Sequence, residues 1–162
     1  MGNRNRRTCL LLCTAAATAL AGLAPGAAPG PRVAYAASFN VSNLADSGPG
    51  SLRQAMLNAQ ASAGADTITF SVSGTITLAS PLPPITAAGG DLIIDARFQE
   101  VFIDGVDAHQ PFVFNAGVSV QIFNLTIERG LGANGGAIRS SANLALADVT
   151  VRDSFATISG GG

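Results

Sequence analysis

The segment IFNLTIER, Ile122–Arg129, repeats as LADVTVRD, Leu146–Asp153, 24 residues further along the chain. A period near 24, built from short apolar stretches and Gly turns, predicts a coil of short parallel strands whose turns stack about 4.8 Å apart. Stepping back by 24 and then 25 residues extends the repeat to two apolar columns, Ile76/Val101/Leu125/Val149 and Leu78/Ile103/Ile127/Val151. We expect both columns to fill the inside of the coil.

The rest of the pattern also favours strands. Besides an alternating run from Asp66 to Leu78, short strands are predicted at Ser38–Val41, Leu92–Ile94, Val101–Ile103, Phe112–Phe114, Val118–Leu125, Leu144–Leu146 and Val149–Val151. The side chains between the columns are expected to point outward: Thr77, Phe102, Thr126 and Thr150. No helices separate these strands, which excludes an alternating β/α sheet. A sandwich or barrel with hairpin turns remains the structural alternative.

One helix is predicted, at about residues 52–62. Ser51 followed by Gln54 forms a capping-box pattern, and Gly64 is expected to end the helix. The apolar residues fall on one stripe: Leu52, Ala55, Met56 and Ala59. The first turn of a coil has an unpaired strand edge and an open apolar core, and an amphipathic helix laid over that end would cover both.

The N-terminal 36 residues have the parts of a secretory signal: Arg residues at the start, an apolar stretch at Thr8–Leu23, and small residues at Ala34 and Ala36. Cleavage is predicted after Ala36. An uncleaved anchor is less favoured, because the apolar stretch is about 16 residues where roughly 20 are needed. The segment Asn5–Leu10 resembles a twin-arginine export motif, although an ordinary basic start looks the same.

These predictions divide the chain into a signal peptide (1–36), an N-terminal cap (37–65) and coil turns (66–162). The mature chain is expected to be secreted or at the cell surface and to have no transmembrane span. Gly160–Gly162 fall where the repeat predicts another turn, so we expect the sequence to be a truncated part of a longer protein.

Composition excludes several function classes. Cys9 and Cys13 both precede the predicted cut, so the mature chain has no disulfide and no thiol nucleophile. There is no Lys, and the mature chain has five Arg against ten acidic residues, a net charge of about −5. This balance argues against nucleic-acid binding.

Several motifs together resemble the N-terminal region of bacterial secreted right-handed β-helix proteins, the CSLREA-motif and polymorphic-outer-membrane-protein-like family. They are DSGPGSLRQA (Asp46–Ala55), GADTITF (Gly64–Phe70), NLTI (Asn124–Ile127) and GGAI (Gly135–Ile138). The motif's Cys and Glu are replaced by Gly50 and Gln54, so any role of that Cys is absent. The resemblance implies an all-β, right-handed parallel β-helix, adhesin-like and with no catalytic residues to transfer. At the repeat length, about four to five turns fit into the mature chain.

Three repeat-equivalent residues, Asp104, Glu128 and Arg152, are expected on the outside of successive turns. Two carboxylates one rung apart could form an acid/base pair or a Ca²⁺ site, and the Arg could act as the base of a polysaccharide lyase. The favoured alternative is a surface ladder in which Arg129 and Arg152 neutralise the acids, including Asp153.

Asp104, Asp107 and His109 are close in sequence and could bind a metal, but one His with two loop acids is a weak pattern. The remaining Phe residues are expected mainly in the core, with Phe102 outside, and Gly135–Gly136 are expected to serve turn geometry. We therefore expect a non-catalytic surface module without cofactors, with surface glycans or envelope proteins as partners. The alternative is the start of a Ca²⁺-dependent polysaccharide lyase or glycoside hydrolase.

Overall fold

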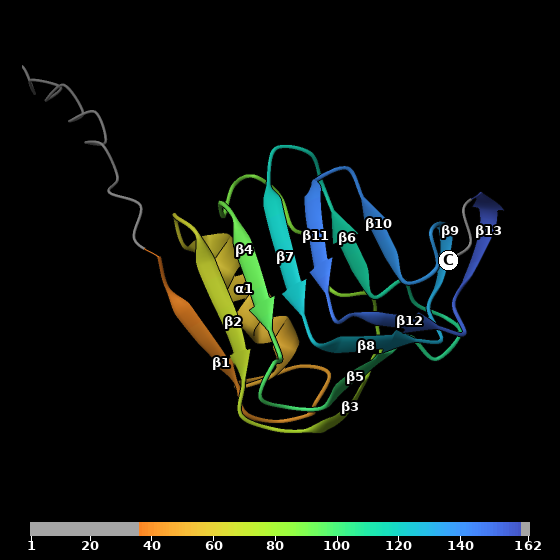
Figure 1. Ribbon diagram of the computed structural model, residues 1–162, viewed down its shortest axis with the longest axis horizontal. Coiled ribbons are helices and arrows are strands. Elements are labelled where there is room, and N and C mark those ends of the chain that lie inside the picture. The colour runs from red at the N-terminus through yellow and green to blue at the C-terminus, as the bar shows by residue number, and fades with distance from the viewer. Residues whose placement is uncertain (1–35, 160–162) are drawn as a thin grey trace, which may run out of the picture. The chain divides into compact units, whose positions relative to one another are not determined.

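The repeat folds as a coil of parallel strands. The computed structural model describes residues 36–159, and this range winds through about five turns of a β-solenoid with one helix near its N-terminal end (Figure 1). Each strand pairing between successive turns is parallel. The predicted all-β solenoid is therefore confirmed. Residues 1–35 of the predicted signal peptide and the glycines at 160–162 lie outside the described range.

A five-stranded sheet takes one strand from each turn. In spatial order its strands are β1 (Ser38–Val41), β2 (Asp66–Phe70), β4 (Leu92–Asp95), β7 (Ser119–Phe123) and β11 (Asn143–Ala147). Because side chains alternate along a strand, every second residue enters the core. Ile68, Ile94 and Ile122 lie in register on successive strands and are fully buried.

A four-stranded sheet carries the columns predicted from the repeat. Its strands are β3 (Gly74–Thr77), β5 (Val101–Asp104), β8 (Leu125–Glu128) and β12 (Thr150–Arg152). Val101 lies level with Leu125, and Ile103 lies level with Ile127. Val151 pairs with Ile127, so the 24-residue spacing is confirmed for the last three turns.

The earliest step of the predicted register is wrong. Ile76 pairs with Ile103 rather than Val101, so the turn between β3 and β5 is 27 residues long, not 25. The outward row changes with it, because Thr75 and not Thr77 lies level with Phe102. Gly74 lies level with Val101, so only the column Ile76/Ile103/Ile127/Val151 continues into β3, and Leu78 lies beyond it. Loops between strands can lengthen without disturbing the stacking, so the spacing changes toward the N-terminal end.

Two shorter sheets complete the coil. β6 (Phe112–Phe114) pairs with β10 (Ile138–Ser140), and β9 (Leu131–Asn134) pairs with β13 (Phe155–Ser159). The sequence predicted β6 but not the other three strands. β9 and β10 expose most of their side chains and lack a clear apolar alternation, so their sequences have no strand signal.

The helix α1 (Leu52–Ala61) forms close to its predicted position. The Ser51 hydroxyl accepts a hydrogen bond from the Gln54 amide at 3.2 Å, which confirms the cap. The reciprocal half of the capping box is absent, because the Gln54 side chain donates to Asn58 instead. The helix ends at Ser62, whose amide bonds to Asn58 and Ala59 carbonyls, rather than at Gly64.

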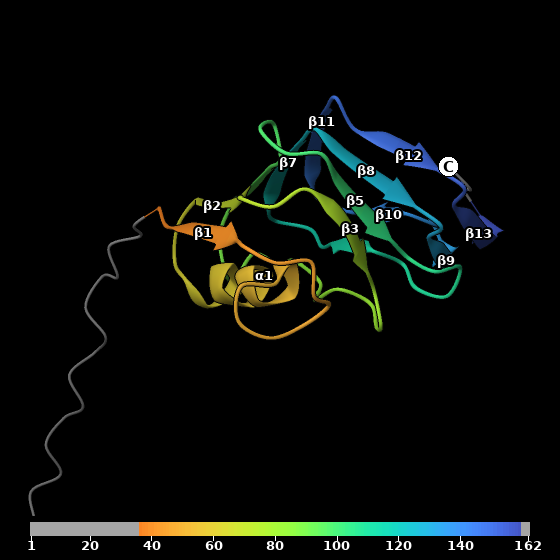
Figure 2. The ribbon, with the colours of Figure 1, turned by 90° about the horizontal axis from the view of Figure 1, so that it is seen from below.

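The helix buries its predicted apolar stripe at the N-terminal end of the coil. It packs against β1 and β2 (Figure 2). Its four stripe residues are at most 4% exposed and belong to the same core as the strand columns: Leu52, Ala55, Met56 and Ala59. The first turns therefore share one continuous core with the helix.

Gly135 and Gly136 have different structural roles. Gly135 has φ +88°, the left-handed conformation that the sequence predicted for this turn. Gly136 lies against the main chain of Phe155 in the next turn, and a side-chain carbon there would collide with that backbone. Close stacking of two turns thus explains the second glycine better than turn geometry does.

Candidate functional site

The outward residues predicted to align do lie on consecutive rungs. Asp104 pairs with Glu128 across β5 and β8, and Arg152 follows level with Glu128 on β12. A second outward row runs beside them. We call these two rows together the outer face: Thr75, Phe102, Thr126, Thr150, Thr77, Asp104, Glu128 and Arg152.

Each acid of the outer face has its own arginine partner. The Asp104 carboxylate, only 4% exposed, forms an ion pair with Arg129, and its Oδ1 accepts the Val106 amide at 2.9 Å. Glu128 Oε2 accepts from Arg152 Nε at 2.7 Å and also from its Nη2. The hydrogen bond from Asp104 raises the pKa of Arg129, which keeps that guanidinium charged.

This arrangement matches the ladder alternative. Arg129 and Arg152 pair with Asp104 and Glu128 one by one, as the ladder interpretation predicted. Asp153, the third acid of that interpretation, is in none of the ion pairs of residues 36–159. Both guanidinium groups are about half exposed, so solvent weakens both ion pairs, although the Asp104 carboxylate itself is only 4% exposed. The main chemical consequence is that each of the two adjacent carboxylates has a guanidinium partner of its own.

The outer face also contains one aromatic ring. Phe102 is half-buried, and the Arg152 guanidinium lies 5.7 Å from its ring centroid. Its neighbours in the row are Thr75 and Thr126. The sequence placed Phe102 outside, which is confirmed. Threonine hydroxyls beside a ring and a guanidinium provide hydrogen-bonding and stacking groups on one side of the sheet.

The other Phe residues divide between the core and the surface. Phe112 and Phe114 are buried and stack with ring centroids 5.6 Å apart. Phe123 is half-buried under the Arg97 guanidinium, 4.8 Å from its centroid. Phe98 is 89% exposed, contrary to the expectation that Phe102 alone lies outside, because it falls in the loop between β4 and β5.

The three candidate metal ligands do not converge. Asp104 faces Arg129, whereas Asp107 is exposed in a left-handed turn with φ 54°. The His109 main chain accepts the Leu131 amide at 3.0 Å, which fixes this loop against the following turn. Over residues 36–159, no three His, Cys, Asp or Glu side chains gather in a group suited to a metal ion.

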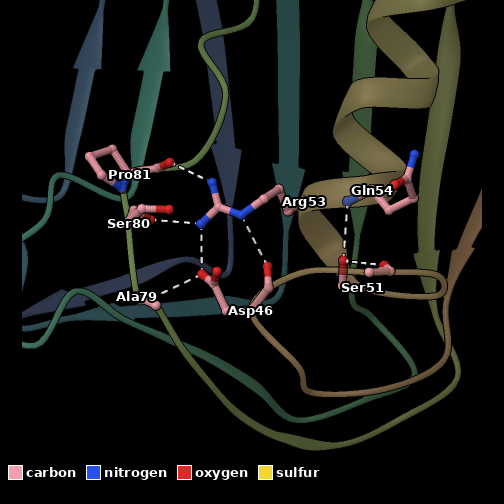
Figure 3. A network of polar contacts seen from close by, with 8 residues as sticks. Asp46, Ser51, Arg53, Gln54, Ala79, Ser80 and Pro81 are labelled. Atoms are coloured by element: carbon pink, nitrogen blue, oxygen red, sulfur yellow. Dashed lines mark hydrogen bonds and ion pairs between the residues drawn. The ribbon is translucent and has the colours of Figure 1, made fainter.

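A polar network that the sequence did not predict joins the helix to the coil (Figure 3). Arg53 donates to the Asp46 carboxylate at 2.6 Å and to the carbonyls of Ser80 and Pro81 at 2.7 and 2.6 Å. The Ala79 amide donates to the same carboxylate at 3.0 Å. The seven-residue spacing of Asp46 and Arg53 is not helical periodicity, so no local pattern marks the pair.

The charge of Asp46 depends on this network. Burial raises the pKa of the carboxyl, but hydrogen bonds from Arg53 and Ala79, together with the positive charges of Arg53 and His109, lower it more. The pKa of Asp46 therefore lies below its ordinary value. The network holds the loop before the helix and the segment after β3 in one position.

A hollow opens beside the last turns of the coil. Its apolar lining comes from β10, β11 and β12 and includes Ile138, Leu144, Leu146 and Val151. The outer-face acids are not part of this lining. The hollow continues the apolar columns of the core. Its walls are inward-facing side chains of the last turns, which no further turn covers within the described residues.

Comparison with known proteins does not assign the chain to a family. No protein-family model matches the chain, and no curated protein is significantly similar to it. The resemblance noted from the sequence motifs therefore stays an expectation, and the structure supports the broader statement that this is a parallel β-solenoid repeat protein. In the described part of the chain, no helix is long and apolar enough to cross a bilayer.

Proposed function

We propose that this protein is an exported, non-catalytic β-solenoid module that binds glycans at a cell surface, in the manner of an adhesin. The basic and apolar signal-like segment at residues 1–36 supports export. The absence of Lys and the net negative charge of the mature chain argue against nucleic-acid partners. A surface glycan is the partner class that these properties leave most favoured.

The outer face is the observation that carries the binding proposal. Thr75 and Thr126 lie on the strands either side of Phe102, and Thr150 follows Thr126 on the next strand, at the regular spacing of a sheet. Glycans are bound by hydroxyl hydrogen bonds combined with stacking on aromatic rings, and the outer face provides both.

A surface substitution on the outer face tests this proposal. Thr126→Arg places a bulky charge beside Phe102, whereas Gln121→Arg places the same charge on the exposed face of β7 in the other sheet. We expect retention on immobilised bacterial polysaccharides, neutral and acidic, to fall at least tenfold in Thr126→Arg and to persist in Gln121→Arg. Equal loss in both variants, or no retention of the unmodified protein, would contradict glycan binding by this face.

The enzymatic alternative predicts a different result. A Ca²⁺-dependent lyase or hydrolase should release unsaturated or reducing ends from acidic polysaccharides and lose this activity in Asp104→Ala and Glu128→Ala. We expect no turnover with or without Ca²⁺, because each acid is already engaged by an arginine side chain rather than directed at an open site. Ca²⁺-dependent product formation that both variants abolish would establish the alternative.

A further inference from the structure

A buried carboxylate near the start of the fold lacks a partner for one of its oxygens. Asp66, the first residue of β2, is 1% exposed and occupies an inward position level with Leu92. Its Oδ1 accepts the Ala37 amide at 2.8 Å and the Ser62 hydroxyl at 3.4 Å. Its Oδ2 is buried without a hydrogen-bond partner. Burying a carboxylate oxygen without a hydrogen-bond donor is unfavourable. A donor for Oδ2 in the functional protein therefore has to be identified.

No side-chain cation accounts for this carboxylate. The four ion pairs in residues 36–159 involve Arg53, Arg97, Arg129 and Arg152, and none includes Asp66. The shorter of its two hydrogen bonds comes instead from the main-chain nitrogen of Ala37. In the uncut chain this nitrogen belongs to a peptide bond and has a single hydrogen, which Oδ1 accepts. No second hydrogen remains on it for Oδ2.

Ala37 is also the residue at which the chain joins the fold. Its carbonyl accepts the Thr67 amide at 2.8 Å, and β1 then runs beside β2 (Figure 1). Ala36 is exposed, whereas Ala37 is half-buried. The predicted cleavage site therefore lies at the boundary between an exposed residue and the first hydrogen-bonded residue of the described range.

We propose that Asp66 is the receptor for the α-amino group of the mature chain. Water hydrolyses the Ala36–Ala37 peptide bond, which leaves a carboxylate on Ala36 and an amine on Ala37. The amine takes up a proton from solvent and becomes an ammonium group with three hydrogens and a positive charge. It can then donate to Oδ2 as well as Oδ1, and it neutralises the buried carboxylate. This inference rests on the proposed export and on its cut after Ala36.

The physical consequence is that processing stabilises the fold. A neutral amide donating to a carboxylate is replaced by a charge-assisted hydrogen bond, which is shorter and stronger. The added attraction arises in a site where water is excluded, so solvent screens it little. Since β1 is the first strand of the five-stranded sheet, the new ion pair would fasten the edge of that sheet to β2.

The first test compares two chains that differ by one residue. One begins at Ala37 and the other at Ala36, and each is released from an N-terminal fusion partner. We expect the chain starting at Ala37 to have an unfolding equilibrium constant at least tenfold smaller, measured by urea denaturation. Asp66→Asn should abolish this difference, whereas Asp107→Asn, at an exposed acid, should preserve it.

The second test needs no substitution. Because the chain has no Lys, its α-amino group is its only primary amine once it starts at residue 36 or 37. We expect an N-hydroxysuccinimide ester to acylate the Ala37 amine at least tenfold more slowly than the Ala36 amine, as followed by mass spectrometry. Equal acylation rates and equal stabilities of the two chains would overturn the role of Asp66 even if its Asn variant failed to fold.

The mass of the exported protein separates this inference from the export proposal. Full-length protein produced in a bacterium is expected to appear outside the cytoplasm and to begin at Ala37. Protein that stays uncut, or is cut elsewhere, would contradict the proposed cleavage site. Ala37 would then not provide the α-amino group of the mature protein in the cell. A start at Ala37 with a freely reactive amine would instead leave export intact and overturn the receptor role of Asp66.

Discussion

At the residue scale, the corners of the coil depend on side chains that tolerate the left-handed conformation. Asn124, with φ 53°, separates β7 from β8, and Asp148, with φ 56°, occupies the equivalent corner 24 residues later. The Asn124 side chain also donates to the carbonyls of Ala96 and Gln99 in the preceding turn, at 3.0 and 3.1 Å. Asn and Asp adopt this conformation more readily than other residues with side chains.

Substitution of Asn124 separates the two contributions of this corner. Asn124→Ala loses both the tolerance of positive φ and two hydrogen bonds, so we expect about 3 kcal/mol less stability in urea unfolding. Asn124→Gly keeps the conformation and should lose roughly half as much. Asn143→Ala, at an exposed position, should change stability by less than about 0.5 kcal/mol. Equal, small effects of the two Asn124 variants would contradict this account.

At the element scale, α1 is held to the coil by its apolar stripe, by Arg53 and by the Gln60 side chain, which accepts a hydrogen bond from the Thr86 hydroxyl at 2.9 Å. The stripe packs on β1 and β2, whereas Arg53 bridges Asp46 before the helix and the carbonyls of Ser80 and Pro81 after β3. The arginine is only 15% exposed, so its hydrogen bonds are protected from water. It fixes the helix relative to two loops that are distant in sequence.

Removal of this arginine should weaken the cap. Arg53→Ala removes one donor from the Asp46 carboxylate, which keeps the Ala79 amide, and the donors of the Asp46, Ser80 and Pro81 carbonyls. We therefore expect a loss of about 2 kcal/mol in the free energy of unfolding. Arg97→Ala is the control, because the Arg97 side chain is 55% exposed and its ion pair with Asp95 should contribute much less. Losses of similar size from both substitutions would show that the network has no special role.

The same network predicts a dependence on pH. A carboxyl whose pKa is lowered by folding stabilises the protein above its unfolded pKa, and this contribution disappears as the pH falls through the folded value. The pKa of Asp46 is lowered, and so is that of Asp95, the latter chiefly by its hydrogen bond from Arg97. We expect the free energy of unfolding to fall below about pH 4, and to fall less steeply in Asp46→Asn. An unchanged slope in this variant would exclude Asp46 as a source.

At the scale of the whole molecule, burial decreases along the coil. The N-terminal end is covered by α1, whereas β11, β12 and β13 each have a strand neighbour on one side only within the described residues. Apolar side chains of these strands are therefore exposed, with Val151 at 40% and Ile158 at 75%. Stability is expected to come mainly from the earlier turns, since each turn of a solenoid is buried by its neighbours.

Two identical substitutions test this gradient. Val101 and Val151 both lie in strands of the four-stranded sheet, but Val101 is 2% exposed and Val151 is 40% exposed. Val101→Ala should lower the free energy of unfolding by about 2 kcal/mol through a cavity in the core. Val151→Ala should lower it by less than about 1 kcal/mol. Comparable losses would mean that the last turn is covered in solution, by another part of the chain or by a second molecule.

The sequence predicted those parts of the fold that repeat locally. The 24-residue period placed Ile103, Ile127 and Val151 in one column, and the helical stripe at Leu52–Ala59 was correct, because buried faces impose their own spacing on the chain. It missed the corner at Asn124, where one apolar run contains two strands. Of the site, it predicted the alignment of Asp104 with Glu128 and favoured their pairing with Arg129 and Arg152.

What the sequence by itself determined is the coil and its stacked columns, since periodic burial is a property of consecutive residues. Only the tertiary structure decided the exact register of Ile76, the bridge from Arg53 to Asp46, and the contact of Asp66 with Ala37. Each of these joins segments whose separation depends on loop lengths. Loops that project from the coil can vary in length, so spacing along the sequence does not show which of these side chains meet. Only the folded coil brings them together.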